Sequence, residues 1–71
     1  MEQFIKSING IEFGFHGFLE GEEEVCRVSV DNHQFKMIVG ENGTWMIWQQ
    51  VPLWIKKLEK ELAEAIDQAY C

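Results

Sequence analysis

The side chains that could carry out acid–base chemistry in this chain are few and poorly spaced for it. Glu12, His16 and Arg27 occupy alternating positions of two short runs, so they would share one face of a strand pair. Glu12 and His16 lie four residues apart on one strand, which separates them by roughly 13 Å. That distance is too long for direct proton transfer between them. The sequence therefore predicts no catalytic acid–base pair, and we expect no enzymatic activity.

The thiols and imidazoles offer no better site. Cys26 and His16 have opposite parity along their strands, which sends their side chains to opposite faces of a sheet. The two cysteines and two histidines of the chain lack the spacing of a zinc site. The pairs Asn9-Gly10 and Asn42-Gly43 are turn signals, and no glycine-rich phosphate loop follows either one. We expect no catalytic residues, no metal and no cofactor.

Composition limits the class of protein. The chain has 71 residues, of which 46% are hydrophobic and 13% aromatic, which is typical of one globular domain spanning residues 1–71. A net charge of −6 argues against binding nucleic acid, which requires a surface of lysine and arginine. No apolar run is long enough for a membrane span, and the first residues lack the apolar core of a secretory signal. With only two cysteines, these features indicate a cytoplasmic protein.

The last third of the chain predicts one amphipathic helix from Pro52 to Tyr70. Proline suits a first helical turn, where its missing N–H would have no partner in any case. A continuous helix of this length would span roughly 28 Å. Its apolar side chains recur at spacings of three and four residues: Ile55, Leu58, Leu62, Ala65, Ile66 and Ala69.

Everything before Pro52 predicts short strands joined by tight turns. Asn9-Gly10 is the strongest hairpin signal, and it sets Ile8 opposite Ile11. At Glu20–Glu23 a loop of two or of four residues remains possible, and the two loops differ by a two-residue shift that preserves the faces. The predicted fold class is α+β: a five-stranded antiparallel β-meander with one C-terminal α-helix packed on one face. The other predicted pairs are Phe4 with Phe15, Phe15 with Cys26, Val30 with Phe35, Val39 with Met46, and Met37 with Trp48.

The residues expected on the face of the sheet turned away from the helix predict an interaction surface there. It would carry Ile38 directly opposite Ile47, with Trp45 one step along. A fully solvated sheet face is more often polar throughout, although single exposed apolar residues are common on any surface. A domain below about 70–80 residues rarely gains more than about 3–5 kcal/mol from one core, which favours association. The candidate contact residues are Phe18, Ile38, Trp45 and Ile47.

Two functions remain open from the sequence. The first is a small non-enzymatic interaction module that contacts a protein partner or a second copy, as in a homodimer, through the open sheet face. The second is an acidic inhibitor or immunity-type protein that neutralises a basic enzyme, because eight acidic residues precede Pro52 against three basic ones. The on-rate of the second should depend steeply on salt, which separates the two. Binding of a small apolar ligand would require a cavity.

Overall fold

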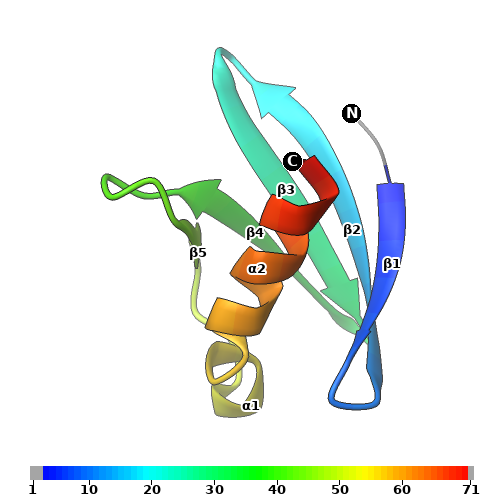
Figure 1. Cartoon of the computed structure of the whole chain (residues 1–71). Coiled ribbons are helices and arrows are strands. Elements are labelled where there is room, and N and C mark those ends of the chain that lie inside the picture. Colours follow the sequence, from blue (N-terminus) through cyan, green and yellow to red (C-terminus); the bar gives the residue numbers. More distant parts are fainter. Residues whose placement is uncertain (1–2, 71) are drawn as a thin grey trace.

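The computed structural model of the chain describes residues 3–70, and it consists of one sheet and two helical segments (Figure 1). The strands pair antiparallel in their order along the chain, which confirms the predicted meander and the α+β class. No helix in the described part of the chain is both long and apolar enough to cross a membrane. The elements are β1 (Gln3–Ile8), β2 (Ile11–Glu20), β3 (Glu23–Val30), β4 (His33–Val39), β5 (Trp45–Ile47), α1 (Leu53–Lys56) and α2 (Glu59–Tyr70).

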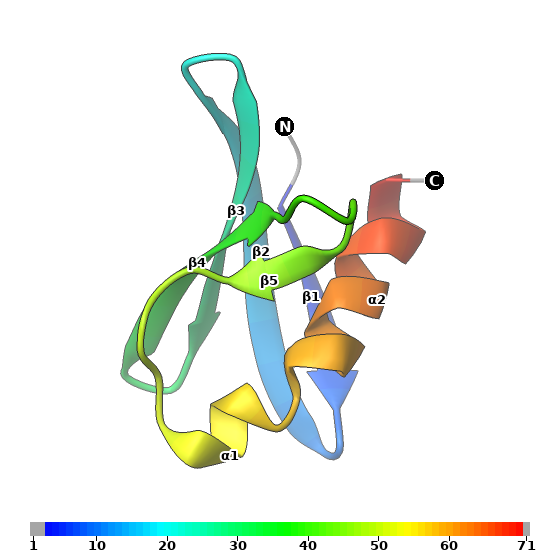
Figure 2. The same ribbon diagram turned by 90° about the vertical axis from the view of Figure 1, so that its left-hand side faces the viewer.

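The C-terminal helix begins where predicted but is interrupted after one turn. Pro52 is the N-cap of α1, and helical hydrogen bonding breaks at Lys57 and Leu58. The N–H of Leu58 bonds the carbonyl of Ile55 at 2.9 Å, three residues back rather than four. The change of direction between α1 and α2 is visible in Figure 2. Because Ile55 and Leu62 are both fully buried, the break lets the two segments face the same core.

The first hairpin has the predicted register. Ile8 lies opposite Ile11 and Phe4 opposite Phe15, whose rings stack with centroids 4.6 Å apart. Asn9 has φ 53° and the glycine after it φ 78°, the two positive values that a type I′ turn requires. The turn sequence therefore fixes both the loop length and the register.

The next two hairpins keep the predicted faces but shift by two residues from the pairs named above. Phe15 lies opposite Val28 rather than Cys26, which is the alternative register left open by the sequence. The turn between β2 and β3 contains only two residues, Gly21, with φ 65°, and Glu22. Between β3 and β4 the turn is residues 31–32 instead of 32–33. The shift is possible because Asp31 adopts a positive φ of 51°, and it sets Val28 opposite Phe35.

The loop between β4 and β5 also differs from the prediction, and this difference changes which side chains of β5 face the helix. It contains five residues, 40–44, and the strands close at the pair Val39–Trp45. Gly43 has φ 80°, the N–H of Thr44 bonds Asn42 Oδ1 at 3.1 Å, and backbone bonds link Gly40 to positions 43 and 44. An odd number of loop residues shifts the register by one, and a shift of one reverses every side chain of the strand.

The predicted orientation of β5 is therefore wrong. Trp45 and Ile47 face the helix, and each is only 5% exposed within the core. Met46 and Trp48, predicted to face the helix, point away from it and are 41% and 60% exposed. Ile38 consequently lies opposite Met46 and not opposite Ile47.

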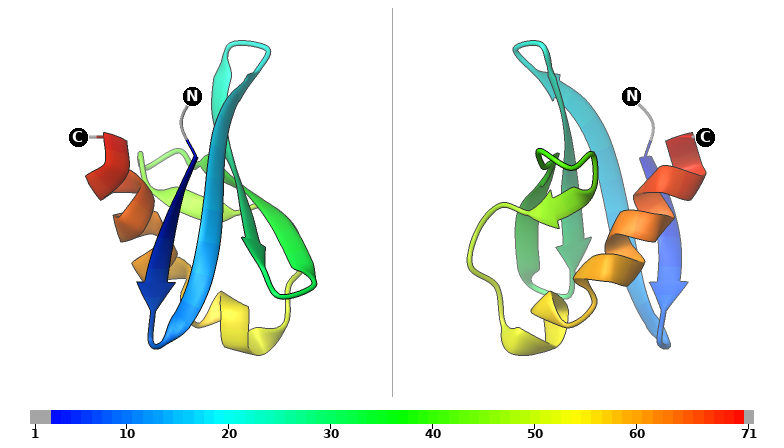
Figure 3. Two further views of the ribbon diagram at one scale, coloured as in Figure 1. Left: turned by 90° about the vertical axis from the view of Figure 1, so that its right-hand side faces the viewer. Right: turned by 60° about the vertical axis from the view of Figure 1, so that its left-hand side comes forward.

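The core fills the space between the sheet and the two helical segments. Helix α2 lies across one face of the twisted sheet, as the two views of Figure 3 show. Lys6 on the edge strand β1 reaches α2, where its Nζ donates to Gln68 Oε1 at 3.3 Å. At the other end, the rings of His33 and Trp54 meet edge-on with centroids 6.2 Å apart. The buried cluster comprises Ile8, Phe13, Phe15, Cys26, Val28, Val30, Phe35, Met37, Trp45, Ile47, Ile55, Leu58, Leu62, Ala63, Ala65 and Ile66.

Candidate functional site: the open sheet face

The structure separates the four predicted contact residues into two groups. Phe18 and Ile38 lie on the face opposite α2, in keeping with the strand alternation. Trp45 and Ile47 belong to the core cluster, so neither can contribute to a surface on that face. The cause is the one-residue shift in the loop before β5.

Two residues that were not among the predicted contact residues, Val25 and Met46, complete an apolar row across the open face. Phe18 on β2 lies opposite Val25 on β3, which lies opposite Ile38 on β4, which lies opposite Met46 on β5. We call these four residues the apolar row. Val25 lies two residues before Arg27 on β3, a spacing that could have placed it on the same face, whereas Met46 was missed because the orientation of β5 was predicted wrongly.

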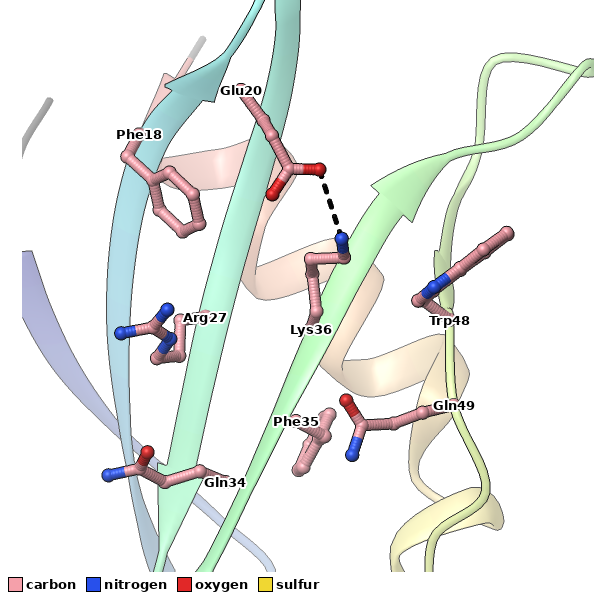
Figure 4. Close-up of a pocket in the computed structure, with 8 residues that line it drawn as sticks. All are labelled: Phe18, Glu20, Arg27, Gln34, Phe35, Lys36, Trp48 and Gln49. Carbon is pink, nitrogen blue, oxygen red and sulfur yellow. Dashed lines mark hydrogen bonds and ion pairs between the residues drawn. The ribbon is translucent and has the colours of Figure 1, made fainter.

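Val25 is buried although it lies on the open face. It is only 1% exposed and does not belong to the cluster beneath α2. Lys36 Nζ and Glu20 Oε1 form an ion pair of 3.1 Å that joins β4 to the end of β2 (Figure 4). According to the strand register, this pair passes across β3 at the level of Val25. Its Glu20 side chain is 59% exposed, so the ion pair contributes about 0–1 kcal/mol and can open at little cost.

A basic row borders the apolar row on one side. His16, Arg27 and Lys36 are cross-strand neighbours on β2, β3 and β4, and we call them the basic row. The guanidinium of Arg27 lies 5.4 Å from the ring centre of Phe18, within range of a cation–π contact. Lys36 Nζ lies 5.9 Å from the ring of Trp48, whose N–H continues the ladder by bonding the Lys36 carbonyl at 2.9 Å.

An acidic row borders the apolar row on the other side. Glu20 and Glu23 are cross-strand neighbours at the end of the β2–β3 hairpin, and we call them the acidic row. Glu22 and Glu24 add further charge at the same tip, and all four carboxylate-bearing residues are exposed. This hairpin projects beyond the other strands in Figures 1 and 2. The open face thus has an apolar centre with charges of opposite sign on its two sides.

An open pocket of about 610 Å³ lies on this face, between the basic row and the end of β5. Three aromatic side chains, two cations, two amides and one carboxylate surround it, and Figure 4 shows their arrangement in front of α2. Such a lining suits contact with a mixed polar and aromatic surface. The lining residues are Phe18, Glu20, Arg27, Gln34, Phe35, Lys36, Trp48 and Gln49.

The residues considered for catalysis are not brought together. His16 Nδ1 lies 2.8 Å from Gln3 Nε2 on the open face, whereas Cys26 is fully buried on the helix side. Burial raises the pKa of the Cys26 thiol to about 11, despite an opposing backbone hydrogen bond from His16. Among residues 3–70, no three side chains of His, Cys, Asp or Glu converge as a metal site would require.

Comparison with protein-family models, curated proteins and solved structures gives no significant match to this chain. A meander closed by a helix hosts unrelated functions, so the fold does not define one. The feature that bears on function is therefore the chemistry of the open sheet face.

Proposed function

We propose that this protein is a small non-enzymatic interaction module that docks a partner protein through its open sheet face. The observation that carries the proposal is the apolar row, which crosses four strands on the face of the sheet opposite α2. Figure 4 views this face, with α2 behind the sheet. On the solvated face of an antiparallel sheet, the side chains are usually polar. The buried, unpaired thiol of Cys26 is in keeping with the cytoplasmic location expected from the sequence.

Trp48 supplies the anchor that such a surface needs. It is 60% exposed, stands next to Lys36, and lies one step from Met46 of the apolar row. Tryptophan is strongly enriched at the energetic centres of protein interfaces, because it buries a large rigid area at a low cost in entropy. The flanking charges would form the polar rim that surrounds such a centre.

Met46→Lys provides a test of this surface. The residue is 41% exposed on the open face, so a charge there should prevent docking while the fold persists. Immobilised parent and variant would be incubated with source-cell lysate, and the captured proteins quantified by mass spectrometry. We expect proteins bound by the parent to be lost from Met46→Lys.

Leu19→Lys is the matched control. Leu19 is 61% exposed and adjacent to Phe18, but strand alternation directs it to the opposite face. It should retain the captured proteins, and both variants should keep the parental melting temperature. Equal capture by all three proteins, or equal loss from both variants, would contradict docking through the open face.

A second candidate is an acidic inhibitor that neutralises a basic enzyme. It is favoured by the β2–β3 hairpin, which projects beyond the other strands (Figure 2). Four exposed glutamates lie at its tip. Carboxylates on a protruding element are placed to enter a basic cleft and to steer association. The observation concerns residues 20–24, a different part of the surface from Met46 and Trp48.

Salt dependence and a tip variant separate this candidate from the first. An acidic inhibitor should bind a captured partner with an on-rate that falls steeply as ionic strength rises. Glu22→Lys should abolish that binding, whereas Met46→Lys should leave it intact. Loss of binding from Met46→Lys with little effect of salt would contradict the inhibitor and favour the interaction module.

A further inference from the structure

We propose that the partner for the open sheet face is a second copy of this chain, bound face to face about a two-fold axis that runs along the apolar row. This inference rests on the function proposed above and names its occupant. The observation behind it is the order of the rows on the face. The acidic row (Glu20, Glu23) and the basic row (His16, Arg27, Lys36) lie one step to either side of Phe18–Val25–Ile38–Met46.

The symmetry follows from this arrangement. A two-fold axis along the apolar row keeps each strand over its counterpart and reverses its direction. The apolar row of one copy then meets that of the other, and each glutamate of the acidic row lies over the basic-row residue of the same strand, while Lys36 on β4 lies over Gly40. On β3 the operation sets Glu23 of one copy over Arg27 of the second copy, because both are two residues from Val25. Antiparallel strands facing one another also match the aligned packing of β-sandwiches.

The other symmetric arrangement is disfavoured by charge. A two-fold axis along β3 would leave each row facing itself, so that Arg27 would meet Arg27 and Glu23 would meet Glu23. Like charges brought together at an interface repel one another and act against such an arrangement. Within one copy, Glu23 and Arg27 are separated by roughly 13 Å along the strand, so neither neutralises the other.

The size of the face sets the expected strength. Four strands spaced at about 4.8 Å and three rows spaced at about 6.7 Å give a footprint of roughly 400 Å² per copy. Stable complexes usually bury about 800 Å² per partner. Dimerisation should therefore be weak and depend on concentration. In the Glu20–Lys36 ion pair the Glu20 side chain is 59% exposed, so it can move aside as the faces meet.

Charge reversal tests the axis directly. Glu23 and Arg27 are both exposed, so Glu23→Arg and Arg27→Glu should each fold as the parent does. Sedimentation equilibrium would be recorded from about 10 μM to about 1 mM, the range of weak association. Each variant alone should dimerise at least about tenfold more weakly, because it places like charges opposite one another. Glu24→Arg is the control: Glu24 points to the other face of the sheet, so this variant should dimerise as strongly as the parent.

An equimolar mixture of Glu23→Arg and Arg27→Glu gives the decisive result. Each variant carries the charge that the other has lost, so we expect a mixed dimer of parental strength. A parent that dimerises without rescue in the mixture would overturn the axis. A parent that stays monomeric would overturn the dimer, while loss of captured partners from Met46→Lys would still support the interaction module. Monomeric behaviour with no effect of Met46→Lys would contradict both.

Discussion

The carboxylate of Glu59 accepts a hydrogen bond of 2.7 Å from the backbone N–H of Ile47, which links the first residue of α2 to the last residue of β5. β5 is an edge strand, and an unpaired edge N–H is a template for the addition of another strand. Lys56 Nζ holds the other oxygen of the carboxylate at 3.0 Å. The contact closes this position of the edge and fixes where α2 begins after the break.

Glu59→Ala should reduce the free energy of unfolding by about 1–3 kcal/mol, because it leaves the N–H of Ile47 without its charged acceptor. Glu61→Ala is the control: Glu61 is exposed on the same helical turn, and its loss should change stability by less than about 0.5 kcal/mol. Urea denaturation measures both. Equal midpoints for the two variants would show that the contact contributes nothing.

The contribution of Glu59 should also depend on pH. Burial raises the pKa of Glu59, but the hydrogen bonds from Ile47 and Lys56 and the charge of Lys56 hold it below its ordinary value of 4.5. A carboxyl group whose pKa is lower in the folded state than in the unfolded state stabilises the fold. This stabilisation is complete at pH values above the ordinary pKa and is lost as the pH falls through the pKa of the folded state. The difference in stability between the parent and Glu59→Ala should be constant from about pH 6 to pH 8 and shrink below about pH 4. Urea titrations at several pH values would reveal a constant difference if this is incorrect.

The two tryptophans around β5 should respond in opposite ways to substitution. Trp45→Ser should cost at least about 3 kcal/mol of stability, because Trp45 is only 5% exposed in the core. Trp48→Ser should change stability by less than about 0.5 kcal/mol, because that side chain is 60% exposed. Thermal and urea denaturation compare them. Stability lost from Trp48→Ser and kept in Trp45→Ser would restore the orientation expected from the sequence.

Much of the fold follows from the sequence because its turns have recognisable chemistry. Asn9-Gly10 has the two positive φ values of a two-residue turn, so the first register was predictable. The next two turns shift the register by two, which leaves Cys26 and Val28 on the predicted face. The helical periodicity of the apolar residues correctly predicts that Leu62 is buried. Alternation within a strand is robust to any even shift.

The errors arise where local signals do not determine geometry. Asn42-Gly43 predicted a two-residue turn, but the loop extends from Gly40 to Thr44 and reverses the strand that follows. No proline or glycine marks the helix break at residues 57–58, which depends on tertiary contacts such as that of Glu59 with Ile47. The candidate site inherits the first error, because its outer strand presents Met46 instead of the predicted Trp45.

Cys26 should be almost unreactive in the folded protein. It is fully buried, and burial raises its pKa to about 11, so little thiolate exists near neutral pH. Cys71, which we expect from the sequence to be an exposed tail thiol, lies outside the described residues, so the experiment would use the Cys71→Ser background. Iodoacetamide labelling followed by mass spectrometry should be slow in the native state and fast in urea. Equal rates would place Cys26 outside the core.

Whether the open sheet face joins two copies is measured by a dilution series of amide chemical shifts on ¹⁵N-labelled protein. Between about 1 mM and about 10 μM, we expect concentration-dependent shifts concentrated at Phe18, Val25, Arg27 and Ile38, with α2 unchanged. Trp48 should shift with them, because it borders the same face. Shifts that do not change with concentration, or that change only in α2 and along the edge of β1, would contradict the claim.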